Sequence, residues 1–264
     1  MKKILKIALI GLLTTLCRIA GQLLIPAGVQ TVLGESVFVK NGTMPLAFTL
    51  YGIFAYALIA AMFLCVRDQL AGHKIMQGVK YGISCCLVWV AYLWEPLPHV
   101  AASDRITYPL ADGLALIVMG ILLGALLGKE NPEPTKMDLS KDLLSIFVIT
   151  ACFVLGRTFQ YLALDIYSCF QEKRLETMVW AVVTGAVIAC TATWLNRHIR
   201  PIRRGLSALL VGGLLFGLDY TLFNFFMPLV FDADIPDLIV RTSVDILSVT
   251  LGCFALPCRT QPGK

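Results

Sequence analysis

Charged residues are scarce in this sequence, and so are long polar segments. Asp, Glu, Lys and Arg make up only 15% of the 264 residues, whereas 58% are hydrophobic. This balance excludes a disordered chain and is far too apolar for an ordinary soluble domain. The segments between the apolar runs are also too short to hold a separate soluble catalytic domain.

Signatures of catalysis and metal binding are missing as well. The three histidines, His73, His99 and His198, have no partner at metal-ligand spacing. The sequence contains no His-Glu-x-x-His motif, no Gly-x-Ser-x-Gly elbow and no phosphate-binding Walker loop. The nine cysteines are scattered and form no Cys-x-x-Cys pair, which indicates packing residues. We therefore assign no cofactor, no metal site and no catalytic residue from the sequence.

What the sequence does contain is long apolar runs. A helix needs about 20 apolar residues to cross a bilayer. The first run continues past Arg18 without a small-residue cleavage site, so we expect a retained helix and not a cleaved signal peptide. The sequence predicts an all-α polytopic integral membrane protein with eight transmembrane helices, at residues 4–25, 45–66, 80–98, 108–128, 143–164, 178–195, 205–230 and 237–257.

Lysine and arginine residues crowd the loops on the side of the N-terminus. Basic loops stay cytoplasmic, so this bias predicts a protein of the cell (inner) membrane with both termini in the cytoplasm. The net charge of +5 therefore reflects topology. The basic segment from Arg197 to Arg204 is expected to face anionic lipid headgroups, and no nucleic-acid partner is predicted.

The most polar, proline-rich segment follows the fourth predicted helix. It divides the chain into a first four-helix membrane repeat at 1–128, a cytoplasmic linker at 129–142 and a second four-helix repeat at 143–264. Since the linker follows an even number of helices, the two halves would have the same orientation. Parallel repeats of this kind occur in transporters.

The two halves also share charged positions. Arg18 in the first predicted helix parallels Arg157 in the fifth, and Asp112 in the fourth parallels Asp245 in the eighth. Their spacing changes only where the first outer loop is longer than its counterpart, and duplications tolerate such differences in loops. A tandem duplication is the interpretation that these positions favour.

Ionisable residues inside the predicted helices lie almost entirely in the outer half of the membrane. Ionisable residues are expensive there and usually mark a ligand site or pair with one another. Helical spacing places several of them on common faces, which should point away from lipid. We predict that they line an outward-facing polar cavity and bind a ligand there. The predicted site residues are Arg18, Gln22, Asp112, Arg157, Gln160, Asp219, Asn224, Arg241 and Asp245.

Within this cavity, Arg18 and Arg157 are expected to hold an anionic group, because guanidinium groups bind carboxylate or phosphate with two parallel hydrogen bonds. Asp112 and Asp245 would balance charge or carry a proton. Alternatively, Arg18–Asp112 and Arg157–Asp245, or Arg241–Asp245 within one helix, are internal pairs that only hold the helices together.

Gly120, Gly124 and Gly128 form a ridge of small residues in the fourth predicted helix. Such a ridge favours close helix packing, and it is also a candidate contact for a homo-oligomer or a membrane partner.

Other features lead to weaker expectations. Glu95 precedes a proline near the membrane interface, where a solvated carboxylate is ordinary, so we expect a structural residue or a loop cap. Trp89, Tyr92 and Trp94 are typical of an interfacial aromatic belt. Residues 36–43 alternate around an Asn-Gly turn, which predicts a small hairpin or a re-entrant flap.

Together these patterns favour a membrane transporter or permease. Its partners would be membrane lipid and a small anionic or amphiphilic solute or lipid bound in the outward-facing cavity. A membrane-embedded enzyme acting on a lipid-linked substrate is an alternative, with Asp112 and Asp245 as a carboxyl pair, but the glycine-rich context of such enzymes is not evident. A non-catalytic accessory or assembly subunit is the third reading.

Overall fold

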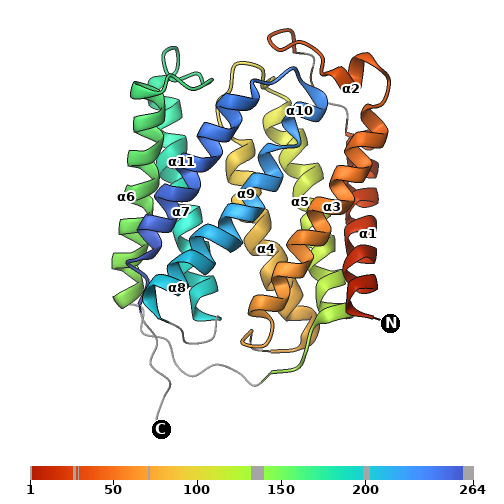
Figure 1. The fold of residues 1–264 in the computed structure, drawn as a ribbon, viewed down its shortest axis with the longest axis vertical. Helices are drawn as coiled ribbons and strands as arrows, with labels where there is room; N and C mark the ends of the chain where they lie inside the picture. Colours follow the sequence, from red (N-terminus) through yellow and green to blue (C-terminus); the bar gives the residue numbers. More distant parts are fainter. Residues whose placement is uncertain are drawn as a thin grey trace.

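A computed structural model of the chain describes residues 2–25, 28, 30–70, 72–131, 140–198 and 203–257. The structure is 77% helical, and the described residues form no β-strand (Figure 1). Most of the predicted linker at 129–142, part of the basic segment after Arg197, and Cys258 lie outside the described residues. The eight described cysteines are free thiols.

Seven helical segments of the described chain are long and apolar enough to cross a membrane, so the prediction of a multi-pass helical membrane protein is confirmed. Their bounds lie within a few residues of those predicted from apolar runs. They are α1 (Lys3–Leu24), α3 (Met44–Val66), α4 (Lys74–Leu93), α5 (Asp104–Leu127), α6 (Ser140–Ala163), α7 (Arg174–Arg197) and the composite segment Arg204–Val230.

The composite segment consists of four short elements. α8 (Arg204–Ala208) leads into η1 (Leu209–Phe216), a π-helical stretch, and α9 (Gly217–Asn224) and α10 (Met227–Val230) follow. α9 ends at Asn224 because the ring of Pro228 would clash with a carbonyl four residues earlier in a continuous helix.

The last helix, α11 (Ile235–Cys253), is less apolar than the other seven segments. Asp237, Arg241 and Asp245 all lie within it, and the eighth membrane crossing is not confirmed by length and composition. Its start is well defined, because Asp234 caps the helix by accepting a hydrogen bond from the Asp237 amide.

The predicted hairpin at residues 36–43 is wrong. The segment forms a single helical turn, α2 (Val37–Lys40), because the Ser36 hydroxyl accepts a hydrogen bond from the Val39 amide and caps it. The Asn-Gly pair does make a turn, with Gly42 at a φ of +68°, but the turn joins α2 to α3.

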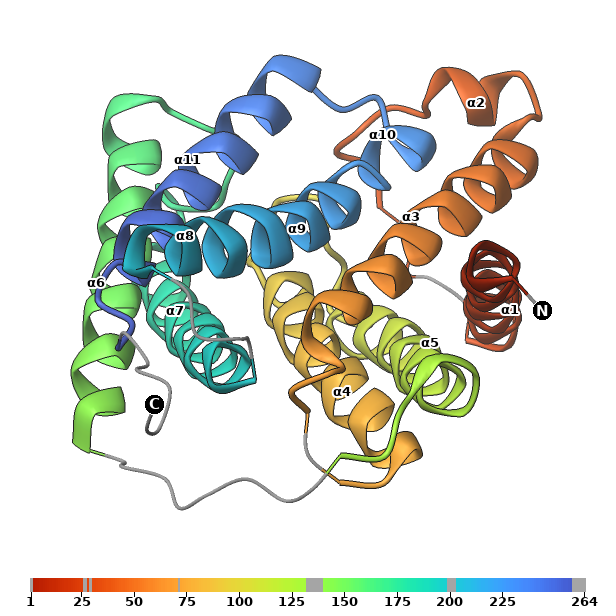
Figure 2. The ribbon, with the colours of Figure 1, turned by 60° about the horizontal axis from the view of Figure 1, so that its bottom comes forward.

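The helices run between two ends of one bundle. α2, α10 and the start of α11 lie at one end, which we call the α2 end (Figure 1). α1 begins at the opposite end. α1 packs against α3 and α5, α6 packs against α7 and α11, and α4 and α9 contact each other between these groups (Figure 2). Large apolar side chains are exposed on the outer helices, as expected for surfaces that face lipid.

The glycine ridge of α5 is packed against α4 of the same chain. A Cβ added at Gly124 would lie 2.5 Å from the Ile75 Cα atom, and one added at Gly120 would lie 2.8 Å from the Gly78 carbonyl oxygen. Gly128 likewise faces Lys74. The face that these glycines present is therefore occupied within the chain.

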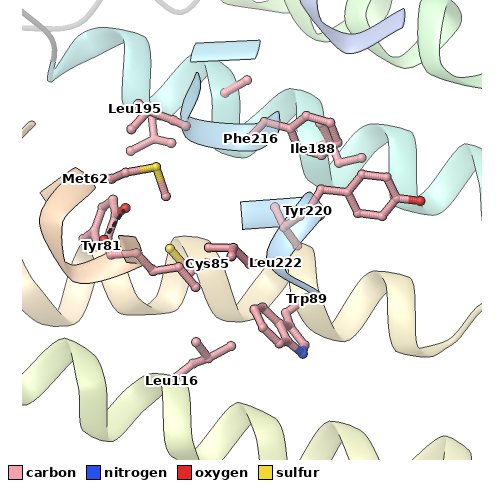
Figure 3. Packing of buried hydrophobic residues seen from close by; sticks show 14 of the residues in the cluster. Met62, Tyr81, Cys85, Trp89, Leu116, Ile188, Leu195, Phe216, Tyr220 and Leu222 are labelled. Carbon is pink, nitrogen blue, oxygen red and sulfur yellow. Dashed lines mark hydrogen bonds between the residues drawn. The ribbon is translucent and has the colours of Figure 1, made fainter. Parts of the chain in front are cut away.

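A single apolar core joins the two halves of the chain. Trp89 of α4, Ile188 of α7, and Tyr220 and Leu222 of α9 are among its buried members (Figure 3). Leu195 lies at the end of the same cluster that is far from Trp89. Since this core contains residues from both halves, it fixes α4 and α9 relative to each other.

Candidate functional site

A cavity of about 170 Å³ opens toward the α2 end, between the two halves of the chain. Its walls are mainly apolar, and its polar groups come from α1, α4, α5, α9 and α11 and from the loops beside them. Five of the nine predicted site residues line this cavity, and they come from α1, α5, α9 and α11. The polar and charged lining residues are Arg18, Gln22, Glu95, His99, Tyr108, Asp112, Asn224 and Arg241.

Arg18 and Asp112 form a buried ion pair on one wall of the cavity. Arg18 Nε donates to Asp112 Oδ1 at 2.6 Å, and Nη2 donates to Oδ2 at 2.8 Å. Trp89 Nε1 donates to the same Oδ2 at 3.0 Å. The carboxylate is thus held by three hydrogen-bond donors.

The Arg18 guanidinium also lies between aromatic rings. Its Cζ atom is 4.0 Å from the centroid of the Phe226 ring and 4.9 Å from that of Phe48. Arg18 also interacts with the Tyr56 hydroxyl, and beyond this contact neither that hydroxyl nor the buried Nη1 has a hydrogen-bond partner among the described residues. An unpartnered guanidinium nitrogen beside a cavity is able to bind an additional acceptor.

A second charge cluster surrounds Arg157, whose side chain has no exposed surface. Its Nη2 donates to Asp245 Oδ2 at 2.6 Å and to the Tyr220 hydroxyl at 2.9 Å, and its Nη1 donates to Glu95 Oε1 at 2.9 Å. Gln160 Nε2 donates to Asp245 Oδ1 at 2.7 Å. This cluster is closed, so Arg157, Gln160 and Asp245 do not line the cavity.

Arg241 connects the closed cluster to the cavity. Its Nη1 lies 3.3 Å from Glu95 Oε2, its Nη2 lies 3.6 Å from Asp237 Oδ2, and Nη2 also donates to the Tyr167 carbonyl. Arg241 therefore pairs with Glu95, and the alternative pairing with Asp245 is not formed. The three arginines are balanced by three deeply buried carboxylates, Asp112, Glu95 and Asp245. The more exposed Asp237 is a fourth carboxylate beside Arg241.

Glu95 was expected to be structural or a loop cap near a solvated interface, and the structure gives it buried ion pairs. The residue is 4% exposed and joins Arg157 of α6 to Arg241 of α11. Glu95 follows the end of α4, but it is not accessible to solvent because the neighbouring helices α6 and α11 extend past that end and cover it.

The interfacial-belt interpretation is wrong for two of its three aromatic residues. Trp89 is 1% exposed and donates to Asp112, while Tyr92 is 3% exposed and donates to Asp245 Oδ2 at 3.1 Å. Only Trp94 is exposed. α4 lies between the two halves, so these rings have no lipid to face and instead hold one carboxylate from each half.

The remaining predicted site residues are divided between two places. Gln22 and Asn224 line the cavity, and Asn224 Nδ2 donates to Thr242 Oγ1 at 2.7 Å. Asp219 instead lines a separate, smaller cleft. No group of three His, Cys, Asp or Glu side chains is placed to hold a metal ion in the part of the chain that the structure describes.

Contacts between the halves occur in matching pairs. Trp180 of α7 donates to the Ala91 carbonyl of α4 at 2.7 Å, and Tyr51 of α3 donates to the Leu222 carbonyl of α9 at 2.9 Å. Similarly, the Trp180 ring lies 4.9 Å from the Arg157 Cζ atom. Phe48 occupies the same place beside Arg18. α3 thus contacts Arg18 and the second half of the chain, and α7 contacts Arg157 and the first half.

His99, in the loop after α4, gives the cavity wall a pH dependence that can be measured. Burial, and secondarily the nearby Arg241, lower the pKa of His99 from 6.5 to about 4. Asp104 opposes this shift. The Tyr167 Oη atom lies 3.1 Å from His99 Nδ1. The unfolded chain therefore takes up a proton near pH 6.5 that the folded protein does not. We expect the stability contribution of neutral His99 to be complete above pH 6.5 and lost by about pH 4, a change of roughly 3 kcal/mol.

Melting temperatures at pH 7.5 and pH 4.5 test this expectation in lipid nanodiscs. His99→Gln should reduce the drop between the two pH values. His73→Gln serves as the control, because the His73 side chain is exposed at the opposite end. An unchanged pH dependence in His99→Gln would contradict the assignment.

Neither a protein-family model, nor a curated protein, nor a solved structure matches this chain. Its function has to be inferred from the geometry and chemistry of the cavity itself.

Proposed function

We propose that the protein is a membrane transporter for a small amphiphile that carries an anionic group. The observation that carries the proposal is a largely apolar cavity between the two halves, with Arg18 on one wall and Arg241 on the other. Ligand sites are typically apolar pockets with a few placed polar groups. The free Nη1 of Arg18 would bind the anionic group, Gln22 and Asn224 would donate further hydrogen bonds, and the apolar wall would hold the hydrocarbon part.

The charges near the cavity favour an amphiphile over a free inorganic anion. The arginines are already neutralised by carboxylates, so the cavity has no excess positive charge to attract an anion from water. An adjoining pocket that shares Arg241 is lined by Asp165, Asp232, Asp234 and Asp237. Burial of apolar surface would therefore have to supply much of the binding free energy.

The proposal includes eight membrane crossings arranged as two parallel four-helix repeats. α11 would be the eighth crossing, because its charged residues face the ion-pair clusters and not the lipid. The repeat is supported by equivalent packing: α1 contacts α3 and α5 as α6 contacts α7 and α11. It is also supported by the ion pair that joins the first and last helix of each half.

We further propose that the protein lies in the cell (inner) membrane with both termini in the cytoplasm, so that the cavity faces outward. The support is the basic bias of the loops at the end opposite α2. Membrane lipid would surround the bundle and would also be a possible source of the amphiphile.

Binding of radiolabelled hexyl phosphate to the protein in lipid nanodiscs tests this function. Unlabelled hexanoate should compete, whereas hexanol, hexyltrimethylammonium and inorganic phosphate should compete poorly, because each lacks either the anionic group or the apolar part. In proteoliposomes, the same ligand should be taken up without chemical change.

A double variant separates binding from folding. Arg18→Gln with Asp112→Asn removes both charges and keeps hydrogen-bonding side chains, so it leaves no stranded charge. We expect hexyl phosphate affinity to fall about tenfold or more, since a charge-assisted hydrogen bond is lost. The matched control is Arg105→Gln with Glu176→Gln, which neutralises an exposed pair 2.5 Å apart and should leave affinity unchanged.

The outcomes distinguish the three candidate functions. Unchanged affinity in the cavity variant, or no uptake by wild-type proteoliposomes, would overturn the proposed transport. A chemically altered hexyl phosphate would identify an enzyme. If loss of folded protein were the only effect of neutralising the pair, the charges would act as a structural connection in an accessory subunit.

A further inference from the structure

Asp219 is a buried carboxyl group that the proposed ligand site does not use. It lies in the first turn of α9 and is 5% exposed. Its Oδ1 has no hydrogen-bond partner among the described residues, and the structure records no ion pair for it there. Asp112, Glu95 and Asp245 are each bound by an arginine, so Asp219 is chemically distinct from these three buried carboxylates.

The carboxyl group lines a cleft that is separate from the ligand cavity. The cleft has a volume of about 30 Å³, which is enough for a single water molecule. Its lining includes Tyr81, near the start of α4, and Leu195, near the end of α7. Both positions are closer to the end opposite α2, whereas the ligand cavity opens toward the α2 end.

A layer of packed aromatic rings from α4 and α9 lies between the two spaces. The Tyr92 and Tyr220 rings are 4.1 Å apart, and Trp89 meets Phe223 with centroids 5.0 Å apart. Trp89 comes from α4 and Phe223 from α9, so each contact crosses between the halves. Asp219 therefore lies below a closed barrier, as seen from the α2 end.

The backbone beside Asp219 is irregular. η1 is an eight-residue π-helix that ends immediately before α9, and π-helical turns are often found at functional sites. The two halves also differ at this point. Val88 lines the same cleft from α4, in the place that the repeat makes equivalent to Asp219, so only one half carries the acid.

Few groups around Asp219 are able to stabilise a negative charge. α4 contributes Tyr81 and Cys85 to the cleft, and α3 contributes the neighbouring Tyr56. α7 contributes Ile188, Thr191, Ala192 and Leu195, and none of the described lining residues is Lys, Arg or His. An isolated carboxylate in such surroundings is costly, so the group takes up a proton in this closed arrangement.

We propose that Asp219 is a proton-binding site that exchanges its proton with the end of the bundle opposite α2. This inference rests on the proposed transport function. Asp219 releases its proton when the cleft opens toward that end, because the carboxylate becomes favourable only when water reaches it. Substrate movement is then coupled to a proton on Asp219. Asp112 and Asp245 are instead held in ion pairs with arginine.

Chemical labelling tests the proton site without any knowledge of the substrate. The wild-type protein in nanodiscs is treated with dicyclohexylcarbodiimide, which adds to protonated carboxyl groups in apolar surroundings and gives an N-acylurea without a leaving group. Peptide mass spectrometry should find the adduct on Asp219, with about tenfold less labelling at high pH than at low pH. An unlabelled Asp219, or an adduct on Asp112 or Asp245 in its place, would overturn the proposal.

Transport assays test the coupling. In proteoliposomes, an acidic outside solution should stimulate uptake of hexyl phosphate, and Asp219→Asn should reduce that stimulated uptake by about tenfold while hexyl phosphate binding stays within about twofold. Glu172→Gln, which removes an exposed carboxyl group, is the matched control. Uptake that ignores the pH gradient, with Asp219 labelled as expected, would overturn the coupling. Absence of hexyl phosphate binding would instead count against the proposed ligand.

Discussion

Arg157→Met is expected to destabilise the protein by about 3–5 kcal/mol, because it leaves Asp245 buried without a cation and removes one of the two arginines that pair with Glu95. The Arg157 side chain has no exposed surface, so water cannot replace the lost hydrogen bonds. We expect a large drop in the amount of folded protein and in its melting temperature in nanodiscs. The cavity should be lost with the fold.

Partial rescue separates stranded charge from lost packing. Arg157→Gln with Asp245→Asn should recover part of the stability, since the one carboxylate that remains in the cluster, Glu95, still pairs with Arg241. Arg105→Met is the control, because Arg105 belongs to an exposed pair worth under about 1 kcal/mol. If Arg157→Met melts like the wild type, the closed cluster does not hold the helices together.

Gly124→Ala is expected to cost about 3 kcal/mol by forcing α4 and α5 apart. The added Cβ atom would lie 2.5 Å from the Ile75 Cα atom and 2.7 Å from the Lys74 and Ile75 carbonyl oxygens. Backbone atoms cannot turn away as a side chain can, so the helices must separate. The measurement is the melting temperature in nanodiscs, together with the yield of folded protein.

Gly113→Ala is the matched control on the same helix. Its Cβ atom would meet only Cys86 Sγ at 3.4 Å and Val90 Cγ2 at 3.7 Å, which are ordinary contacts. Because both variants make the same change in helix propensity, their difference isolates the steric effect. Equal melting temperatures would show that the close approach of α4 and α5 does not matter for stability.

The membrane helices could be predicted closely, because their signal is local. An apolar run and its polar flanks are enough to place each end, and α3 (Met44–Val66) begins and ends within one residue of its prediction. The Arg18–Asp112 and Arg157–Asp245 pairs could be anticipated for a similar reason. Each charge lies at the same depth as its partner, and an intramembrane charge requires a partner.

The role of α4 could not be predicted from its own sequence. Trp89, Tyr92 and Glu95 have the composition of a membrane interface, and what makes them buried is the position of α4 between α7 and α9. That position depends on long-range packing. The proposed repeat offers one sign that Trp89 and Tyr92 are buried, since the corresponding positions of α9 are the aromatic residues Tyr220 and Phe223.

Asp219 and the segment 36–43 were misjudged for different physical reasons. Asp219 was grouped with the cavity by depth alone, but the aromatic layer of Trp89 and Tyr220 divides that depth into two spaces. In residues 36–43 the alternating pattern is real, yet the Ser36 cap satisfies the first amides locally and favours a helical turn over a strand.

The cancellation of charge in the two clusters has an electrical consequence. A voltage of 100 mV does work of about 2.3 kcal on each mole of unit charge carried fully across a bilayer. Arg18, Arg157 and Arg241 are matched by Asp112, Glu95 and Asp245, so shifting this group as a unit transfers no net charge. The empty protein should consequently produce no gating current when the membrane is depolarised.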